Sequence, residues 1–200
     1  AGDDFSLHID GEEVGSLPSL PADIDFGHVR RLTLRNMALE QIEEDFLRRF
    51  THLRELDLRN NQLTRLPVGL EQFTGLRSLH LAGNQIIVDP PGSQRLASLT
   101  SLQVLDLNYN PLGQVPDLSS LRHLREVSLR ATGLQTLPDE AAMPWRGLVD
   151  MRENQIRQVT GHLRTLGARL QRLSLHDNPL DEASEASIAS SLSDSPVNRS

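Results

Sequence analysis

The sequence predicts an α/β repeat solenoid, in which short parallel strands stack on one side and irregular or short helical segments pack on the other. Three observations support this prediction. Leucine supplies 36 of the 200 residues and aromatic residues only 4%, so the core must be built from repeated aliphatic positions. One aliphatic pattern recurs along most of the chain, and Leu-Pro or Val-Pro follows three of its copies at one offset. Such units bury their apolar side chains by stacking on their neighbours.

The recurring pattern is LxxLxLxxNxL. Its seven copies begin at Val29, Leu53, Leu76, Leu102, Leu124, Arg146 and Leu170. The spacings between these starts are 24, 23, 26, 22, 22 and 24 residues, within the period of about 20 to 29 residues that leucine-rich repeats show. Aliphatic residues at the fourth and sixth positions predict a short strand with one apolar face. We therefore expect a leucine-rich-repeat horseshoe with a concave parallel sheet.

The ninth position of the pattern predicts a ladder of amide side chains. Five copies have Asn there, namely Asn61, Asn84, Asn110, Asn154 and Asn178. An amide can bond to main-chain groups of its own turn and of the next repeat, because it both donates and accepts. The other two copies have Met37 and Thr132, and a thioether makes no such bonds while a hydroxyl makes only some. We expect packing to hold these two turns.

The chain divides into three parts. Residues 1–28 are expected to form an acidic N-terminal cap with one degenerate repeat, whose strand contains Leu7 and Ile9. Residues 29–180 hold the seven repeats. Residues 181–200 are expected to begin with a capping helix and to end in a flexible Ser-rich linker. The chain has no Cys, which excludes disulfide caps.

The segments on the convex side differ in their predicted structure. Residues 40–50 and 161–170 have patterns typical of helices. In three other returns, Pro follows the strand closely, and Pro disrupts a helix interior. We expect irregular or short helical turns in those returns.

Composition excludes several classes of protein. Without Cys, this chain carries no cysteine nucleophile and no zinc ribbon. No apolar run approaches the roughly 18 residues that span a bilayer, and the acidic start lacks the basic region of a secretory signal. We therefore expect a soluble chain with no membrane insertion, no metal and no cofactor. Its first residue, Ala1, favours a piece of a longer protein.

Charge is distributed unevenly. Residues 1–28 contain seven acids and no Arg or Lys, which accounts for the whole net charge of −7. The remaining 172 residues balance to zero. All twenty basic residues are Arg.

The repeats resemble those of a known family. The segments NNQLTRLP, ATGLQTLP and NYNPLGQVP, with MRENQIRQV and LSLHDNPL, are similar to the repeat domains of bacterial type III secreted effectors that carry a C-terminal novel E3 ubiquitin ligase domain. The resemblance covers roughly residues 29–180 and implies a protein-interaction module that recognises the ligase's substrate in the host cell cytoplasm. The catalytic Cys of such proteins lies in a separate domain, so this chain is not expected to be an enzyme. The repeats are longer than the 20-residue units of the shortest family members.

The absence of Lys has two explanations. A GC-rich coding sequence favours Arg codons. Alternatively, a substrate adaptor beside an active ligase escapes modification when it offers no Lys side chain. The chemical difference between the two cations is the physical basis of the second explanation.

The concave face is the expected binding surface, because solenoids of this kind commonly bind partners there. Its outward positions hold ten Arg and seven acids, which makes the face mildly positive. Tyr109 is the only Tyr of the chain, and Tyr and Arg are enriched at interface hot spots. We expect Tyr109 to be open to a partner and the surrounding Arg side chains to grip its carboxylates. The candidate binding residues are Arg35, Arg59, Arg77, His80, Asp106, Tyr109, Arg130 and Arg152. The expected partner is a host or other protein with an acidic surface, bound by a monomer.

Several alternatives stay open at this point. Charged side chains on the concave face could merely neutralise one another. His80 lies between Asp57 and Asp106 on adjacent strands and could mimic an acid-base or metal site, but an open sheet excludes no water. Arg columns could follow nucleic-acid phosphates, which the net charge of −7 disfavours. A receptor ectodomain is a further alternative, but such repeat arrays usually end in Cys-rich caps, and this chain has no Cys. A stand-alone binding protein or scaffold without a ligase domain is the main alternative function.

Overall fold

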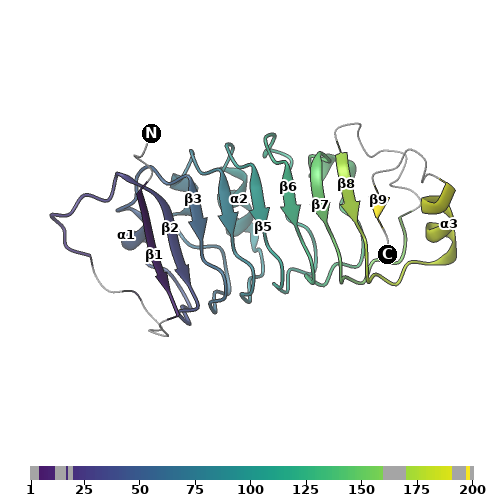
Figure 1. Cartoon of the computed structure of the whole chain (residues 1–200), viewed down its shortest axis with the longest axis horizontal. Helices are drawn as coiled ribbons and strands as arrows, with labels where there is room; N and C mark the ends of the chain where they lie inside the picture. Colours follow the sequence, from purple (N-terminus) through teal and green to yellow (C-terminus); the bar gives the residue numbers. More distant parts are fainter. Residues whose placement is uncertain (1–4, 12–16, 18–19, 160–169, 191–196, 199–200) are drawn as a thin grey trace.

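The protein is an elongated stack of short parallel strands (Figure 1). The computed structural model describes residues 5–11, 17, 20–159, 170–190 and 197–198. Within these ranges, one sheet has the strand order β1 to β9, and every neighbouring pair is parallel. The strands are β1 (Phe5–Asp10), β2 (Val29–Arg35), β3 (Glu55–Asp57), β4 (Ser78–His80), β5 (Val104–Asp106), β6 (Glu126–Ser128), β7 (Gly147–Asp150), β8 (Leu170–Ser174) and β9 (Val197–Asn198). This arrangement confirms the predicted horseshoe fold.

Leucines at the fourth and sixth positions form the core beneath the sheet. Leu56, Leu79 and Leu105 are aligned in register on β3, β4 and β5, and each is fully buried. Leu58, at the sixth position, is equally buried just after β3 ends. Burying such a side chain contributes about 1.5 to 3 kcal/mol, so the repeated leucines supply most of the apolar stabilisation.

The predicted Asn ladder is present. The Asn61 Nδ2 atom donates to the carbonyl oxygens of Leu34 at 2.7 Å and Leu58 at 3.0 Å, while its Oδ1 atom accepts from the backbone N–H groups of Met37 and Leu39. Each ladder amide bonds its own turn and the preceding repeat rather than the next one. Asn84, Asn110, Asn154 and Asn178 bond in the same way.

Thr132 replaces this ladder only in part, as predicted. Its hydroxyl donates to the Leu129 carbonyl of its own turn at 2.8 Å. The backbone N–H of Leu112 in the preceding repeat bonds instead to the Asn110 carbonyl at 2.9 Å. The link between these two repeats therefore lacks the side-chain bridge that the Asn copies provide.

The described residues of the convex side form little helix. It contains α1 (Glu44–Leu47), α2 (Pro90–Ala97) and two short 3-10 turns, η1 (Leu70–Gln72) and η2 (Glu140–Ala142). The helix predicted over residues 40–50 is confined to the four residues of α1, because the chain must return to the start of β3. The helix predicted over residues 161–170 lies outside the described residues except at Leu170, which begins β8.

Helix α2 was not predicted from the sequence, although its start is well marked. Asp89 caps the helix by accepting a hydrogen bond from the Gly92 backbone N–H at 2.7 Å. Pro90 and Pro91 occupy its first turn, where the missing N–H groups are of no consequence. An Asp followed by Pro is therefore the signal that sequence reasoning overlooked.

The two ends of the stack are closed differently. At the N-terminus, Leu7 and Ile9 of β1 pack partly buried against the core. The C-terminal helix is α3 (Glu182–Ser190), whose Ile188 and Ser184 are fully buried. Strand β9 was not expected, because the sequence predicts flexible linker there. The remaining linker residues, 191–196 and 199–200, lie outside the described part of the chain.

No helix in the described ranges is long and apolar enough to cross a membrane.

Candidate binding face on the concave sheet

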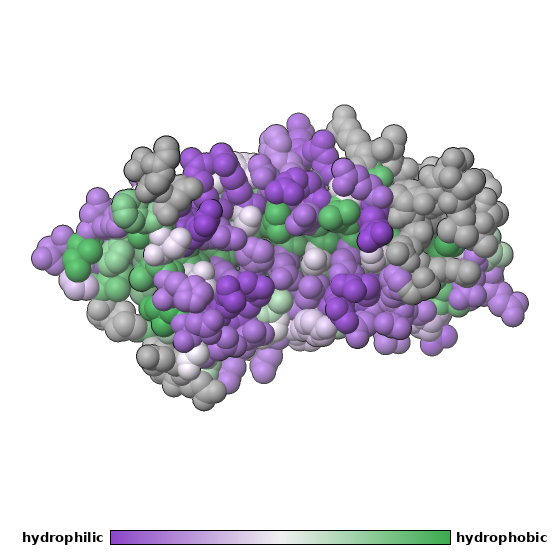
Figure 2. Space-filling model, viewed as in Figure 1, coloured by the Kyte–Doolittle hydropathy of each residue, from purple (hydrophilic) through white to green (hydrophobic). Residues whose placement is uncertain are grey.

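The concave face displays the third, fifth and seventh positions of each repeat as columns. The parallel register aligns the fifth positions from strand to strand, so Asp57, His80 and Asp106 are consecutive neighbours. Figure 2 shows hydrophobic residues in the middle of this face, over β5 and β7, between bands of hydrophilic residues. The columns thus place chemically different side chains one strand apart.

Asp57 organises the N-terminal part of the face. Its carboxylate accepts two hydrogen bonds from the Arg59 side chain, at 3.0 Å from Nε and 2.8 Å from Nη2. The Arg35 Nε atom lies 2.8 Å from the same carboxylate as an ion pair, without hydrogen-bond geometry. Burial raises the pKa of Asp57, but the hydrogen bonds from Arg59 and the charges of both guanidinium groups outweigh it, and the pKa lies below its usual value. Arg35 and Arg59 are therefore engaged within the chain.

His80 is also engaged by carboxylates. Its Nε2 atom lies 3.3 Å from Glu55 Oε1 and its Nδ1 atom 4.0 Å from Asp106 Oδ2. Interaction with Asp106 raises the pKa of His80 above its usual value against the effect of burial, and the charges of Asp57 and Glu55 add to this. In the part of the chain that the structure describes, no group of three His, Asp or Glu side chains could hold a metal ion.

Tyr109 lies in the turn that follows β5, three residues past the end of the strand, and is half-exposed, at 50%. The Arg130 guanidinium lies over its ring, 5.7 Å from the ring centre. Tyr109 has a positive φ of 58°, and every other residue at the eighth position of the seven repeats also has a positive φ. The others are Asn36, Asn60, Gly83, Ala131, Glu153 and Asp177. Gly, Asn and Asp tolerate this left-handed conformation, whereas a bulky residue is uncommon there.

Arg130 and Arg152 flank this ring, but each has a carboxylate partner. Arg152 forms a forked pair with Asp150, at 2.9 Å from Nε and 2.7 Å from Nη2. Arg130 pairs through Nε with Glu153. These hydrogen bonds raise the pKa of both Arg side chains. The prediction that both are free to grip a partner's carboxylates thus neglects their intramolecular partners, since sequence reasoning did not assign individual pairs.

A hollow of about 380 Å³ opens over β6, β7 and β8. Leu148 lines it and is 41% exposed. The other lining residues are Glu126, Val127, Ser128, Val149, Asp150, Arg152, Arg172, Ser174 and His176. Arg172 is exposed, and the described residues provide no ion pair for it or for Arg77. The sequence analysis did not include Arg172 and His176 among the candidate residues, although they occupy the third and seventh positions of the last repeat, which face the concave side.

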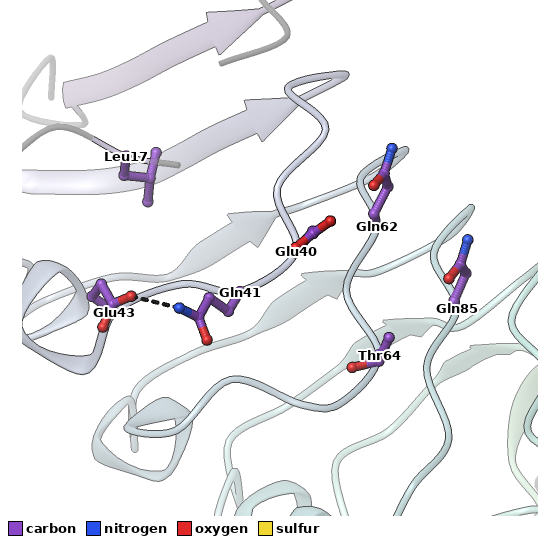
Figure 3. Close-up of a pocket in the computed structure, with 7 residues that line it drawn as sticks. All are labelled: Leu17, Glu40, Gln41, Glu43, Gln62, Thr64 and Gln85. Carbon is purple, nitrogen blue, oxygen red and sulfur yellow. Dashed lines mark hydrogen bonds between the residues drawn. The ribbon is translucent and has the colours of Figure 1, made fainter. Parts of the chain in front are cut away.

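A second hollow, of about 580 Å³, lies near the N-terminus where the strands end (Figure 3). Figure 3 shows Gln62 and Gln85 projecting from successive turns, while Gln41 donates a hydrogen bond of 2.9 Å to Glu43. Glu40, Thr64 and Leu17 complete the lining. Among the described residues that line it, Leu17 is the only apolar side chain, so these residues offer little surface for an apolar ligand.

Comparisons with known proteins agree with this geometry. Residues 27–86 match the family model described as leucine rich repeat, and residues 74–120 match the model described as leucine rich repeats in two copies. The fold and its buried Asn ladder define a leucine-rich-repeat solenoid. No curated protein matches the sequence.

Two solved structures are similar in fold. The leucine-rich-repeat domain of a Shigella effector superposes with a TM-score of 0.71 at 20% identity, covering 97% of this chain and 80% of that one. The functional domain of InlJ from Listeria monocytogenes, which includes a cysteine ladder, gives a TM-score of 0.59 at 20% identity. That match covers 79% of this chain and 33% of the other.

Proposed function

We propose that this domain is a protein-interaction module that binds its partner on the centre of the concave face, over β5 to β8. The conformation of Tyr109 carries the proposal. A left-handed backbone costs an ordinary residue about 1 to 2 kcal/mol, and half of the Tyr109 side chain lies in solvent. The fold therefore gains little from an aromatic residue there, whereas a binding site gains a large, rigid anchor.

Other exposed residues of the concave face indicate the partner's chemistry. Leu148 offers an exposed aliphatic surface, and the hollow beside it can accept a side chain. Arg172 is a cation without an intramolecular carboxylate among the described residues, so it is available to a partner's acids. An apolar anchor next to carboxylates on the surface of another protein fits this arrangement best.

We further propose that the parent protein is a bacterial secreted effector, in which this domain selects a host substrate for a C-terminal E3 ubiquitin ligase domain. The repeat motifs support this, as does the fold shared with the Shigella effector domain. A chain without Lys would offer no side-chain acceptor to an adjacent ligase. A stand-alone binding module that acts as a monomer is the alternative, and the reading frame beyond Ser200 separates the two.

The binding proposal is tested by quantitative capture of proteins from host-cell lysate with two matched variants. Tyr109→Asn removes the ring but leaves a residue that suits the left-handed conformation. Val68→Asn, a control, removes a side chain on the convex side that is 39% exposed. We expect Tyr109→Asn to lower capture of a specific partner at least about tenfold, in line with a hot-spot residue. Equal capture by Tyr109→Asn, with loss in Val68→Asn, contradicts the concave assignment.

A further inference from the structure

A second surface, the edge of the sheet where the strands start, carries a row of Arg side chains. Five Arg side chains lie there, and we call them the basic edge: Arg54, Arg77, Arg122, Arg125 and Arg146. The segments that lead into β3 to β7, residues 50–54, 73–77, 99–103, 121–125 and 144–147, contain no Asp or Glu. The upper edge of the molecule in Figure 2 is correspondingly hydrophilic above β3 to β7.

The sheet itself brings these cations together. The Arg77 backbone N–H donates to the Arg54 carbonyl at 2.8 Å, Gln103 donates to Arg77 at 2.8 Å, and Arg125 donates to Gln103 at 2.9 Å. Consecutive strands lie about 4.8 Å apart, so Arg54 and Arg77 are direct neighbours and Arg125 follows two strands on. Like charges placed side by side on a sheet are unfavourable, and the fold offers them little compensation.

Intramolecular carboxylates compensate for very little of this charge. Within the described ranges, the one ion pair formed by the basic edge joins Arg125 to Glu126 at 3.6 Å, between side chains that are 59% and 41% exposed. An exposed pair of this kind contributes little. Glu55, next to Arg54, is engaged by Arg31 and His80 instead.

We propose that the basic edge binds an extended acidic segment of a protein, separately from the concave face. Four strand steps of about 4.8 Å separate Arg54 from Arg146, and about six residues of extended chain span that length. Guanidinium groups pair with carboxylates in forked geometry. A nucleic acid fits less well, because bases stack on aromatic side chains and the Phe and Trp side chains of these segments, Phe50, Phe73 and Trp145, are all buried.

The test uses a fluorescein-labelled hexaglutamate peptide, titrated against the whole chain at low salt. Arg54→Gln/Arg77→Gln removes two neighbouring cations of the basic edge. Arg65→Gln/Arg157→Gln is the control, since it makes the same change in net charge at two exposed Arg side chains away from that edge. We expect the first pair to weaken peptide binding at least about fivefold and the control to change it less than about twofold.

Two further arms separate this surface from other sources of binding. Tyr109→Asn should leave hexaglutamate binding unchanged, so the basic edge and the concave face can fail independently. A single-stranded DNA hexamer and phosphatidylserine vesicles should bind more weakly than the peptide. Tighter binding of either probe, equal losses in the two Arg pairs, or no measurable peptide binding overturns the proposal.

Discussion

The two halves of the concave face use the same repeat positions for different purposes. Between β2 and β5, the columns hold Asp57 and His80, whose charges are matched by neighbouring side chains. Between β5 and β8, the columns hold the exposed Leu148 beside Arg172, which forms no ion pair among the described residues, and the half-exposed Tyr109 lies in the turn after β5. A leucine-rich repeat thus fixes where a side chain points, while the side chains on adjacent strands decide whether it stabilises the fold or remains free to bind a partner.

The largest effect is expected beneath both halves, in the Asn ladder. Asn61→Ala leaves two backbone carbonyls and two N–H groups without their side-chain partner in a buried turn. Unsatisfied buried groups cost about 1 to 3 kcal/mol each and are not additive, so we expect a loss of about 4 kcal/mol in unfolding free energy. Urea denaturation measures it, and a loss below about 1 kcal/mol would contradict the bridging role of the amide.

Asp57→Asn and Asp150→Asn compare the two halves directly. Both carboxylates accept a forked pair from an Arg two residues on, but Asp57 also faces Arg35 and its side chain is 5% exposed against 20% for Asp150. We expect Asp57→Asn to cost about 2 kcal/mol and Asp150→Asn less than about 1, allowing for the partly exposed guanidinium groups. Equal losses in thermal denaturation would show that the two halves do not differ as proposed.

Asp57 and His80 make the stability of the folded chain depend on pH. The pKa of Asp57 is lowered in the folded chain, so its contribution is present above the ordinary value of 3.8 and is lost as the pH falls through the folded pKa. The contribution of His80 to stability changes with pH in the opposite direction, because the pKa of His80 is raised in the folded chain. Its contribution is complete below the ordinary value of 6.5 and is lost as the pH rises through the folded pKa.

His80→Gln tests this second dependence. The substitution should lower the melting temperature more at about pH 5.5 than at about pH 8.5, by an amount that corresponds to about 1 kcal/mol or less. His123→Gln, a substitution of an exposed His outside the cluster, is the control and should show no such difference. A larger loss at the higher pH would reverse the assigned sign.

Thr132→Asn should have the smallest effect and should be favourable. An Asn at this position can donate to the Leu107 carbonyl of the preceding repeat and accept from the Leu112 N–H, as the other ladder residues do. We expect a gain of about 0.5 to 1 kcal/mol in unfolding free energy. Thr132→Val, which keeps the shape but removes the hydroxyl, should instead destabilise the chain.

The sequence predicts the repeated parts of this fold well. The buried fourth position, such as Leu56, and the bridging ninth position, such as Asn61, follow from the periodicity, because the repeats share one backbone conformation. The sequence did not predict strand β9 or helix α2. Each occurs only once, so no repeated pattern marks it. For the site, the columns were predicted, but the partner of the Arg130 guanidinium was not, because its contact with Glu153 joins two repeats and depends on the tertiary structure.

Stability and binding, both measured on the single variant Tyr109→Asn, test most directly whether this side chain serves recognition. Denaturation in urea gives the unfolding free energy, and titration with the captured partner gives the affinity. We predict that the variant is as stable as the parent chain or more stable by up to about 1 kcal/mol, because Asn suits the left-handed backbone, while the affinity falls at least about tenfold. A variant that loses stability and binds its partner normally would contradict the claim that Tyr109 serves recognition rather than folding.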